Sequence, residues 1–179
     1  MPEIEIRPVA SNDVEGLSLF EHNYYSDYVW QMGLDLNKDT TRTTFRRTRL
    51  PRRVFVSYPR QKEDIFNEIN QSEAFLVAVL DNRPVGYIKV LVEKDSMNAR
   101  VSDLVVSASM RRQGIASGLI YAAMDLISRR HYFALILEMQ SKNDPAINMA
   151  GKLGFKFCGY RDLYFPNKEL ALFFSSFSH

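Results

Sequence analysis

The first thirty residues pass from an alternating to a helical pattern of apolar positions. Apolar and polar side chains alternate over residues 4–9, as in a half-buried strand. Ser11-Asn12-Asp13 then supplies side chains that favour a helix N-cap, so a helix is expected from about Asp13. Its apolar positions recur at helical spacing, at Val14, Leu17, Phe20, Tyr24, Tyr28 and Val29. The pattern therefore predicts a strand and then a helix with one buried stripe.

The periodicity is weaker in the next segment, which is also strongly basic. Helices are expected over residues 40–50 and 61–69, with Pro51 and Pro59 as interruptions. Nine Lys or Arg and one acid lie between Lys38 and Lys62, a charge of +8 that leaves −6 for the rest of a chain of net charge +2. We interpret the segment as a solvated helix and loop face. A patch that receives an anion or a nucleic acid is the alternative.

Apolar runs mark three strands in the middle of the chain. Residues 74–80 and 85–92 flank Asp81-Asn82-Arg83-Pro84, which predicts a β-hairpin. A third strand is expected over residues 99–107. Helical periodicity follows over residues 115–130 and ends in two arginines, which suit a helix C-terminus.

The remaining pattern completes an α/β fold. Residues 133–139 are nearly all apolar, as expected for a buried parallel strand that returns by a crossover connection. Asn143-Asp144-Pro145 is typical of a helix start, and residues 154–157 and 170–174 are expected to be the last strands. A length of 179 residues fits one domain over residues 1–179, with a mixed central sheet flanked by helices.

Composition excludes several classes of protein. Cys158 is the only cysteine, so neither an intrachain disulfide nor a cysteine-based zinc site is possible. Three scattered histidines suggest no metal site. The N-terminus has no signal-peptide pattern, and the longest apolar run, residues 74–80, is too short to cross a bilayer. A cytoplasmic protein without a membrane partner is expected.

The clearest chemical signal is the strand over residues 103–106 with the basic turn that follows it. Gly114 and Ala116 stand at the expected start of a helix, where missing side-chain bulk lets a ligand approach the backbone. A helix N-terminus presents unpaired N–H groups and about half a positive charge, to which Arg111 and Arg112 add. The turn is therefore a candidate cradle for a pyrophosphate. Gly-Lys-Ser/Thr and Gly-x-Gly-x-x-Gly are both absent, which excludes a P-loop and a Rossmann dinucleotide site.

Two motifs in sequence order resemble the GNAT superfamily of N-acetyltransferases. Arg111-Arg112-Gln113-Gly114-Ile115-Ala116 is similar to the family's pyrophosphate loop. About thirty residues later, Asn143-Asp144-Pro145-Ala146-Ile147 and Lys152-Leu153-Gly154-Phe155 resemble its second coenzyme A segment. The resemblance covers the chain from about residue 74 and implies a GNAT fold whose sheet is splayed where acetyl-CoA enters. The ending Ala171-Leu172-Phe173-Phe174 after Gly159-Tyr160 is more loosely similar to members that acetylate streptothricin-type antibiotics, and Glu138 is similar to the glutamate of a peptide-Nα-acetylating branch.

The resemblance implies how acetyl-CoA would be held. Backbone groups of the strand would pair with the pantetheine arm, with the amide of Val106 facing the thioester carbonyl. Amides from Arg112 to Ser117 would bind the pyrophosphate, and Asn143 would bind or shape the pantetheine groove. The residues expected to hold acetyl-CoA are Leu104, Val105, Val106, Arg111, Arg112, Gln113, Gly114, Ile115, Ala116, Ser117, Asn143 and Ala146.

Catalysis by direct attack of an amine on the thioester needs a base, an oxyanion donor and an acid. Glu138 interrupts an apolar strand where a peptide-acetylating branch carries its glutamate, and is the candidate base. The Val106 amide is the candidate oxyanion donor. The family's usual acid is a tyrosine at a position that is Ala150 here. Tyr164 is the candidate replacement; Tyr160, Tyr121 and an unprotonated thiolate are the alternatives.

These expectations lead to two functional hypotheses. The first is an N-acetyltransferase that acts on a primary amine of a small molecule or a peptide, with an acceptor wall made by Tyr24, Tyr25, Tyr28, Trp30 and residues 160–166. The second is a non-catalytic acyl-CoA sensor whose basic segment docks RNA or another anion, which the missing tyrosine favours. A homodimer is left open by both.

Overall fold

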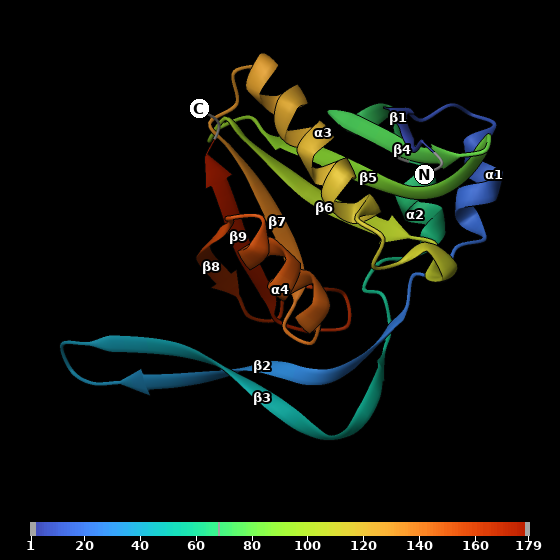
Figure 1. The fold of residues 1–179 in the computed structure, drawn as a ribbon. Coiled ribbons are helices and arrows are strands. Elements are labelled where there is room, and N and C mark those ends of the chain that lie inside the picture. Colours follow the sequence, from blue (N-terminus) through green and yellow to red (C-terminus); the bar gives the residue numbers. More distant parts are fainter. Residues whose placement is uncertain (1–2, 68, 178–179) are drawn as a thin grey trace.

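The central element of the fold is a mixed β-sheet. The computed structural model describes residues 3–67 and 69–177, and within them seven strands pair side by side (Figure 1). In sheet order they are Glu5–Pro8 (β1), Ala74–Leu80 (β4), Arg83–Glu93 (β5), Asn98–Val106 (β6), Ala134–Gln140 (β7), Ala171–Phe177 (β9) and Lys156–Arg161 (β8). The β6–β7 pair is parallel and the other pairs are antiparallel.

Helices cover both faces of this sheet. On one face lie Ile115–Arg129 (α3) and Asp144–Lys152 (α4), which bury the larger apolar cluster together with alternate strand residues such as Ile88 and Leu137 (Figure 1). On the opposite face lie Asp13–Ser18 (α1) and Lys62–Asn67 (α2), packed on a second cluster around Tyr87 and Val105. Short 3-10 turns occupy Ile69–Gln71 and Ala108–Met110. Among the described residues, no helix is long and apolar enough to cross a membrane.

Most of the predicted elements are confirmed. The first strand, the hairpin β4–β5, the strand β6, the helix α3, the parallel strand β7 and the helix α4 lie where the hydrophobic pattern places them. The helix expected over residues 61–69 is α2 followed by a 3-10 turn. The last two strands are longer than expected and pair as a hairpin.

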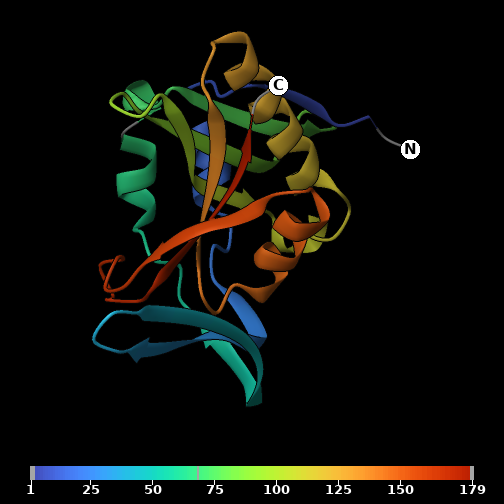
Figure 2. The ribbon, with the colours of Figure 1, turned by 90° about the vertical axis from the view of Figure 1, so that its left-hand side faces the viewer.

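The prediction for residues 19–56 is wrong. The first helix ends at Ser18, and the helix expected over residues 40–50 is absent from the described structure. Instead, Tyr24–Leu36 (β2) and Thr41–Val56 (β3) form a long antiparallel hairpin outside the main sheet (Figures 1 and 2). Tyr24 and Tyr28 are spaced by four, which suits one face of a strand as well as one face of a helix. Aromatic and β-branched residues decide in favour of the strand.

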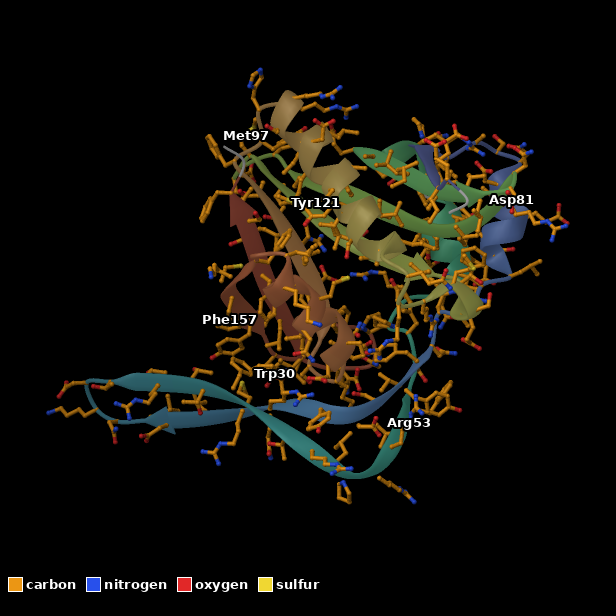
Figure 3. All side chains as sticks on the ribbon, viewed as in Figure 1. Trp30, Arg53, Asp81, Met97, Tyr121 and Phe157 are labelled. Atoms are coloured by element: carbon orange, nitrogen blue, oxygen red, sulfur yellow. The ribbon has the colours of Figure 1, made fainter. Side chains whose placement is uncertain are left out.

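The hairpin carries the basic segment from Lys38 to Arg53, so the helix and loop face expected there is corrected to a β-ribbon. Its arginines lie along β3, and the ribbon extends past the edge of the main sheet (Figures 1 and 3). Trp30 and Arg47 are cross-strand partners and share the face that meets the body. Both bind the carboxylate of Asp144 at the start of α4, Trp30 at 3.1 Å and Arg47 by two contacts of 2.7 and 2.8 Å.

Candidate active site

A split between two neighbouring strands forms the candidate site. Within the described residues, β6 and β7 pair only from Ala99 with Leu135 to Val101 with Leu137. The β5–β6 register then shifts between Lys89 and Val90, which leaves Ser102 as a bulge at the point where the split begins. The splayed sheet expected from the family resemblance is therefore present.

The open edge of β6 presents backbone groups to this split. The Ser107 N–H donates to the Val85 carbonyl at 2.9 Å. Bonded and non-bonded pairs alternate along an antiparallel ladder, so Val106 and Leu104 direct their N–H and C=O groups away from β5. Consistent with this, Arg111 Nε donates to the Val106 carbonyl at 3.1 Å. The Val106 amide thus lies on the side of β6 that faces the split.

The turn into α3 has the geometry of an anion cradle. Gly114 is the N-cap residue with φ +84°, and Arg112 also has a positive φ of 65°. A Cβ built on Gly114 has no heavy atom within 4 Å, so the space in front of this turn is open. The first amides of this 15-residue helix have no carbonyl of a preceding turn to bind. The residues present therefore fit a pyrophosphate at this end of the split.

Two side chains of the turn, Arg111 and Gln113, bind main-chain carbonyls of the protein. Arg111 directs its guanidinium at main-chain carbonyls of the segment before β2, at 2.6 Å from Glu21 and 3.4 Å from Asn23. Gln113 Nε2 donates to the Ser109 carbonyl at 3.4 Å. Arg111 therefore fixes the turn against the N-terminal segment, and the cradle itself is made by backbone.

The start of α4 forms the other wall. Asn143 Oδ1 accepts from the Ala146 N–H at 3.3 Å and so caps the helix. An open cleft lies between the walls. Its lining combines both diverging strands, α4 and two loops: Tyr58, Pro59, Arg60, Val101, Ser102, Asp103, Leu104, Leu137, Glu138, Met139, Gln140, Asn143, Ala146, Met149 and Phe165.

Glu138 lies in this cleft with a fully buried side chain. One carboxylate oxygen binds Arg60, and the other binds Arg100 and accepts from the Tyr164 hydroxyl at 2.9 Å. Burial and the neighbouring Glu138 charge raise the pKa of Tyr164, so this hydroxyl keeps its proton at neutral pH. The structure thus brings together Glu138 and Tyr164, two candidates separated by 26 residues.

A second buried carboxylate, Asp103, was missed by the sequence analysis. It accepts from the Tyr58 hydroxyl at 2.7 Å and the Ser102 hydroxyl at 2.8 Å, and Arg60 lies 3.6 Å away. Burial and the Asp103 charge raise the pKa of Tyr58 well above its usual value. Like Glu138, Asp103 is an acid within an apolar strand, and this signal was available in the sequence.

The other expected residues lie farther from the cleft. Tyr121 is exposed on α3, and Tyr160 shares a hydrogen bond of 2.9 Å with Thr43 on the hairpin. Ala150 is buried in the core under α4. Of the expected aromatic wall, Phe165 lines the cleft, and Tyr24 donates to Gln140 of its lining at 2.9 Å. Within residues 3–67 and 69–177, no group of three or more His, Cys, Asp or Glu side chains could hold a metal ion.

A mixed sheet opened between two parallel strands, beside a glycine-led helix N-terminus, defines the class of acyl-CoA N-acyltransferase folds. The model of the Acetyltransferase (GNAT) family matches residues 36–155, so the chain belongs to this family. That match covers the split, the cradle and the start of α4.

Individual relatives agree with this assignment. An N-alpha-acetyltransferase of Sulfurisphaera tokodaii is 34% identical over 94 residues, which are 46% of this chain and 56% of the relative. Streptothricin acetyltransferase A of Bacillus subtilis is 23% identical over 73% of this chain and 77% of the relative. A Bacillus anthracis structure, described as a streptothricin acetyltransferase in complex with acetyl coenzyme A, has a TM-score of 0.78 at 22% identity and covers 98% of this chain and 99% of that chain. This chain therefore spans about half of the archaeal relative and most of the other two.

Proposed function

We propose that this chain is an acetyl-CoA-dependent N-acetyltransferase that acts on a primary amine. The observation that carries the proposal is the open edge of β6, which leads from the split to the Gly114 cradle. A pantetheine arm can pair with this edge while its pyrophosphate meets the amides of α3. Membership of the GNAT family and the acetyl coenzyme A complex of a structural relative support this cosubstrate.

In the proposed reaction the neutral amine attacks the thioester carbonyl. A C–N bond forms, the carbonyl oxygen becomes an oxyanion that accepts from the Val106 amide, and the C–S bond then breaks to release a thiolate. Loss of one such oxyanion donor typically costs about 3 kcal/mol of barrier. Glu138 takes the proton that the amine loses, directly or through water, and Tyr164 returns a proton to the thiolate. The hydrogen bond from Tyr164 to Glu138 supports this pairing of roles.

The acceptor is an amine of a small molecule or the N-terminus of a peptide. Both classes are represented among the relatives, as a streptothricin acetyltransferase and an N-alpha-acetyltransferase. A panel should therefore include streptothricin, spermidine and short peptides with free N-termini, with release of the coenzyme A thiol as the readout.

The cradle is tested by thermal unfolding with and without saturating acetyl-CoA. Ligand at about 100 times its Kd should add about 2.7 kcal/mol to the free energy of unfolding. Gly114→Glu places bulk and negative charge in the open space and should remove this shift. Gly151→Glu is the matched control, because a Cβ there is also uncrowded but lies on α4. No shift in the wild-type protein would refute the cosubstrate.

The second candidate function, a non-catalytic acyl-CoA sensor, rests on Ala150, which gives α4 no hydroxyl near the cleft. The amine panel separates the enzyme from the sensor, since a sensor is stabilised by acetyl-CoA but acetylates no amine. For an enzyme, Glu138→Gln should lower turnover by about 10²-fold or more and leave acetyl-CoA binding intact. If the basic hairpin docks RNA, affinity should fall steeply with salt.

A further inference from the structure

The segment of residues 57–60, between β3 and α2, spans the split between β6 and β7. The Ser57 carbonyl accepts from Gln140 Nε2 of β7 at 3.2 Å. Tyr58 donates to Asp103 of β6 at 2.7 Å. One end of the Arg60 guanidinium donates to the Ser102 carbonyl of β6 at 2.8 Å, and the other binds Glu138 of β7. The segment thus contacts both strands just beyond their last backbone pair.

Arg60 is the member of this segment that joins the two strands through a single side chain. Burial disfavours its charged form, but the carboxylates of Asp103 and Glu138 outweigh this effect and raise its pKa. A planar guanidinium can bind a carbonyl and a carboxylate in fixed directions, whereas the ammonium of lysine has no such fixed fork. Arg60 therefore holds the Glu138 carboxylate at a set distance from the bulge at Ser102.

Arg100 binds the same carboxylate from a different position. It lies on the paired part of β6, and its guanidinium also lies 3.4 Å from Glu93. Arg100 therefore ties Glu138 to the closed part of the sheet, and Arg60 ties it to the part where β6 opens.

We propose that Arg60 is a positioning residue for Glu138 in amine acetylation. This inference rests on the proposed function. Arg60 fixes the carboxylate relative to the β6 edge that carries the Val106 amide, so that the proton acceptor and the oxyanion donor keep one geometry. The hairpin β2–β3 leads directly into this segment.

The test measures steady-state kinetics of full-length variants with acetyl-CoA and an amine of the panel that the wild-type protein acetylates. Arg60→Gln should lower kcat by about 10-fold or more, within the range of a general base. The Kd for acetyl-CoA should stay within about twofold, because the cradle at α3 is built from other residues. Arg46→Gln, an exposed arginine of the same hairpin, is the control and should leave both unchanged.

Two further measurements separate positioning from folding. Adding Arg60→Gln to Glu138→Gln should lower kcat little further, since both changes act through one carboxylate. Guanidinium ion, at concentrations that leave the protein folded, should restore part of the activity of Arg60→Ala but not of Glu138→Gln.

Each outcome has a defined meaning. Wild-type kcat in Arg60→Gln, additive losses in the double variant, or loss of acetyl-CoA binding without rescue by guanidinium would overturn the positioning role. Absence of turnover by the wild-type protein with every amine of the panel would overturn the proposed function itself and Arg60's role with it.

Discussion

The unit β6–α3–β7 and the hairpin β2–β3 are held in place by different kinds of contact. In the first, buried apolar residues such as Leu119, Ile120 and Leu135 join the helix to the two strands. The hairpin projects from the body (Figures 1 and 3), and its contacts with the body are mixed: Trp30 and Arg47 bind the Asp144 carboxylate, and Phe45 packs on aromatic rings of β8. An isolated two-stranded hairpin is marginally stable in water, so these contacts decide whether the hairpin stays docked.

This difference predicts that the hairpin can be loosened without unfolding the cofactor unit. Asp144→Ala removes a buried carboxylate that accepts from Arg47, Trp30 and Asn148. Arg47 stays partly exposed and solvated when its partner is removed, so loss of the hydrogen bonds to this carboxylate should lower the free energy of unfolding by about 1–2 kcal/mol. Urea unfolding measures this loss, and proteolysis should begin in the turn at residues 37–40.

Asp35→Ala provides the control for Asp144→Ala. Asp35 is exposed near the end of the hairpin, so its removal should change stability by less than about 0.5 kcal/mol. Equal losses in the two variants would show that the contacts at Asp144 do not hold the hairpin.

The same contrast explains what the sequence could and could not predict about the fold. Strands β4 to β7 and the helix α3 are apolar on the side that packs, so local pattern and tertiary burial agree. The spacing of Tyr24, Tyr28 and Trp30 fits a helix or a strand; their aromatic side chains favour the strand, and Trp30 also contacts Asp144, more than a hundred residues away. Local periodicity contains no information about such a partner.

A second prediction concerns His22, at the joint between α1 and the hairpin. Its Nδ1 lies 2.9 Å from the Phe20 carbonyl and donates to it, and its Nε2 accepts from Tyr87 at 2.7 Å. Burial lowers its pKa below the usual 6.5. The folded state therefore excludes a proton that the unfolded chain binds, so stability is complete above about pH 6.5 and is lost as the pH falls.

The free energy of unfolding of the wild-type protein should thus decrease between pH 7 and pH 5.5, with a slope of at most about 1.4 kcal/mol per pH unit from this residue. His22→Gln should remove that contribution, as measured by urea unfolding at several pH values. An unchanged pH dependence would contradict a neutral buried His22.

A third prediction compares two uncrowded glycines, one in the cradle and one in α4. Gly114→Ala should destabilise by about 1 kcal/mol, because its φ of +84° disfavours any side chain. Gly151→Ala should stabilise by up to about 1 kcal/mol, because alanine is a better helix former. Thermal unfolding of both variants without ligand measures the two changes in stability. If Gly114→Ala stabilised the protein as Gly151→Ala does, the left-handed turn at Gly114 would be contradicted.

Only part of the candidate site could be predicted from the sequence, because only some of its residues lie in a local sequence pattern. Glu138 and the Gly114 turn could be identified from the sequence because each interrupts a regular pattern at a position that resembles the family motif. Arg60 and Tyr58 could not, because they lie outside that motif and reach the cleft only after the hairpin returns the chain to the sheet. The side-chain contacts of the site depend on this return, which periodicity does not describe.

The contact between Arg47 and Asp144 also affects when the hairpin can dock during synthesis of the chain. Arg47 and Asp144 are 97 residues apart in the chain. At a synthesis rate of about 5–20 residues per second, the ribosome needs about 5–20 seconds to add the carboxylate after the arginine. During that interval the nascent basic ribbon carries its charges without the partner that docks it. Docking of the hairpin on Asp144 can therefore occur only after the start of α4 has left the ribosome.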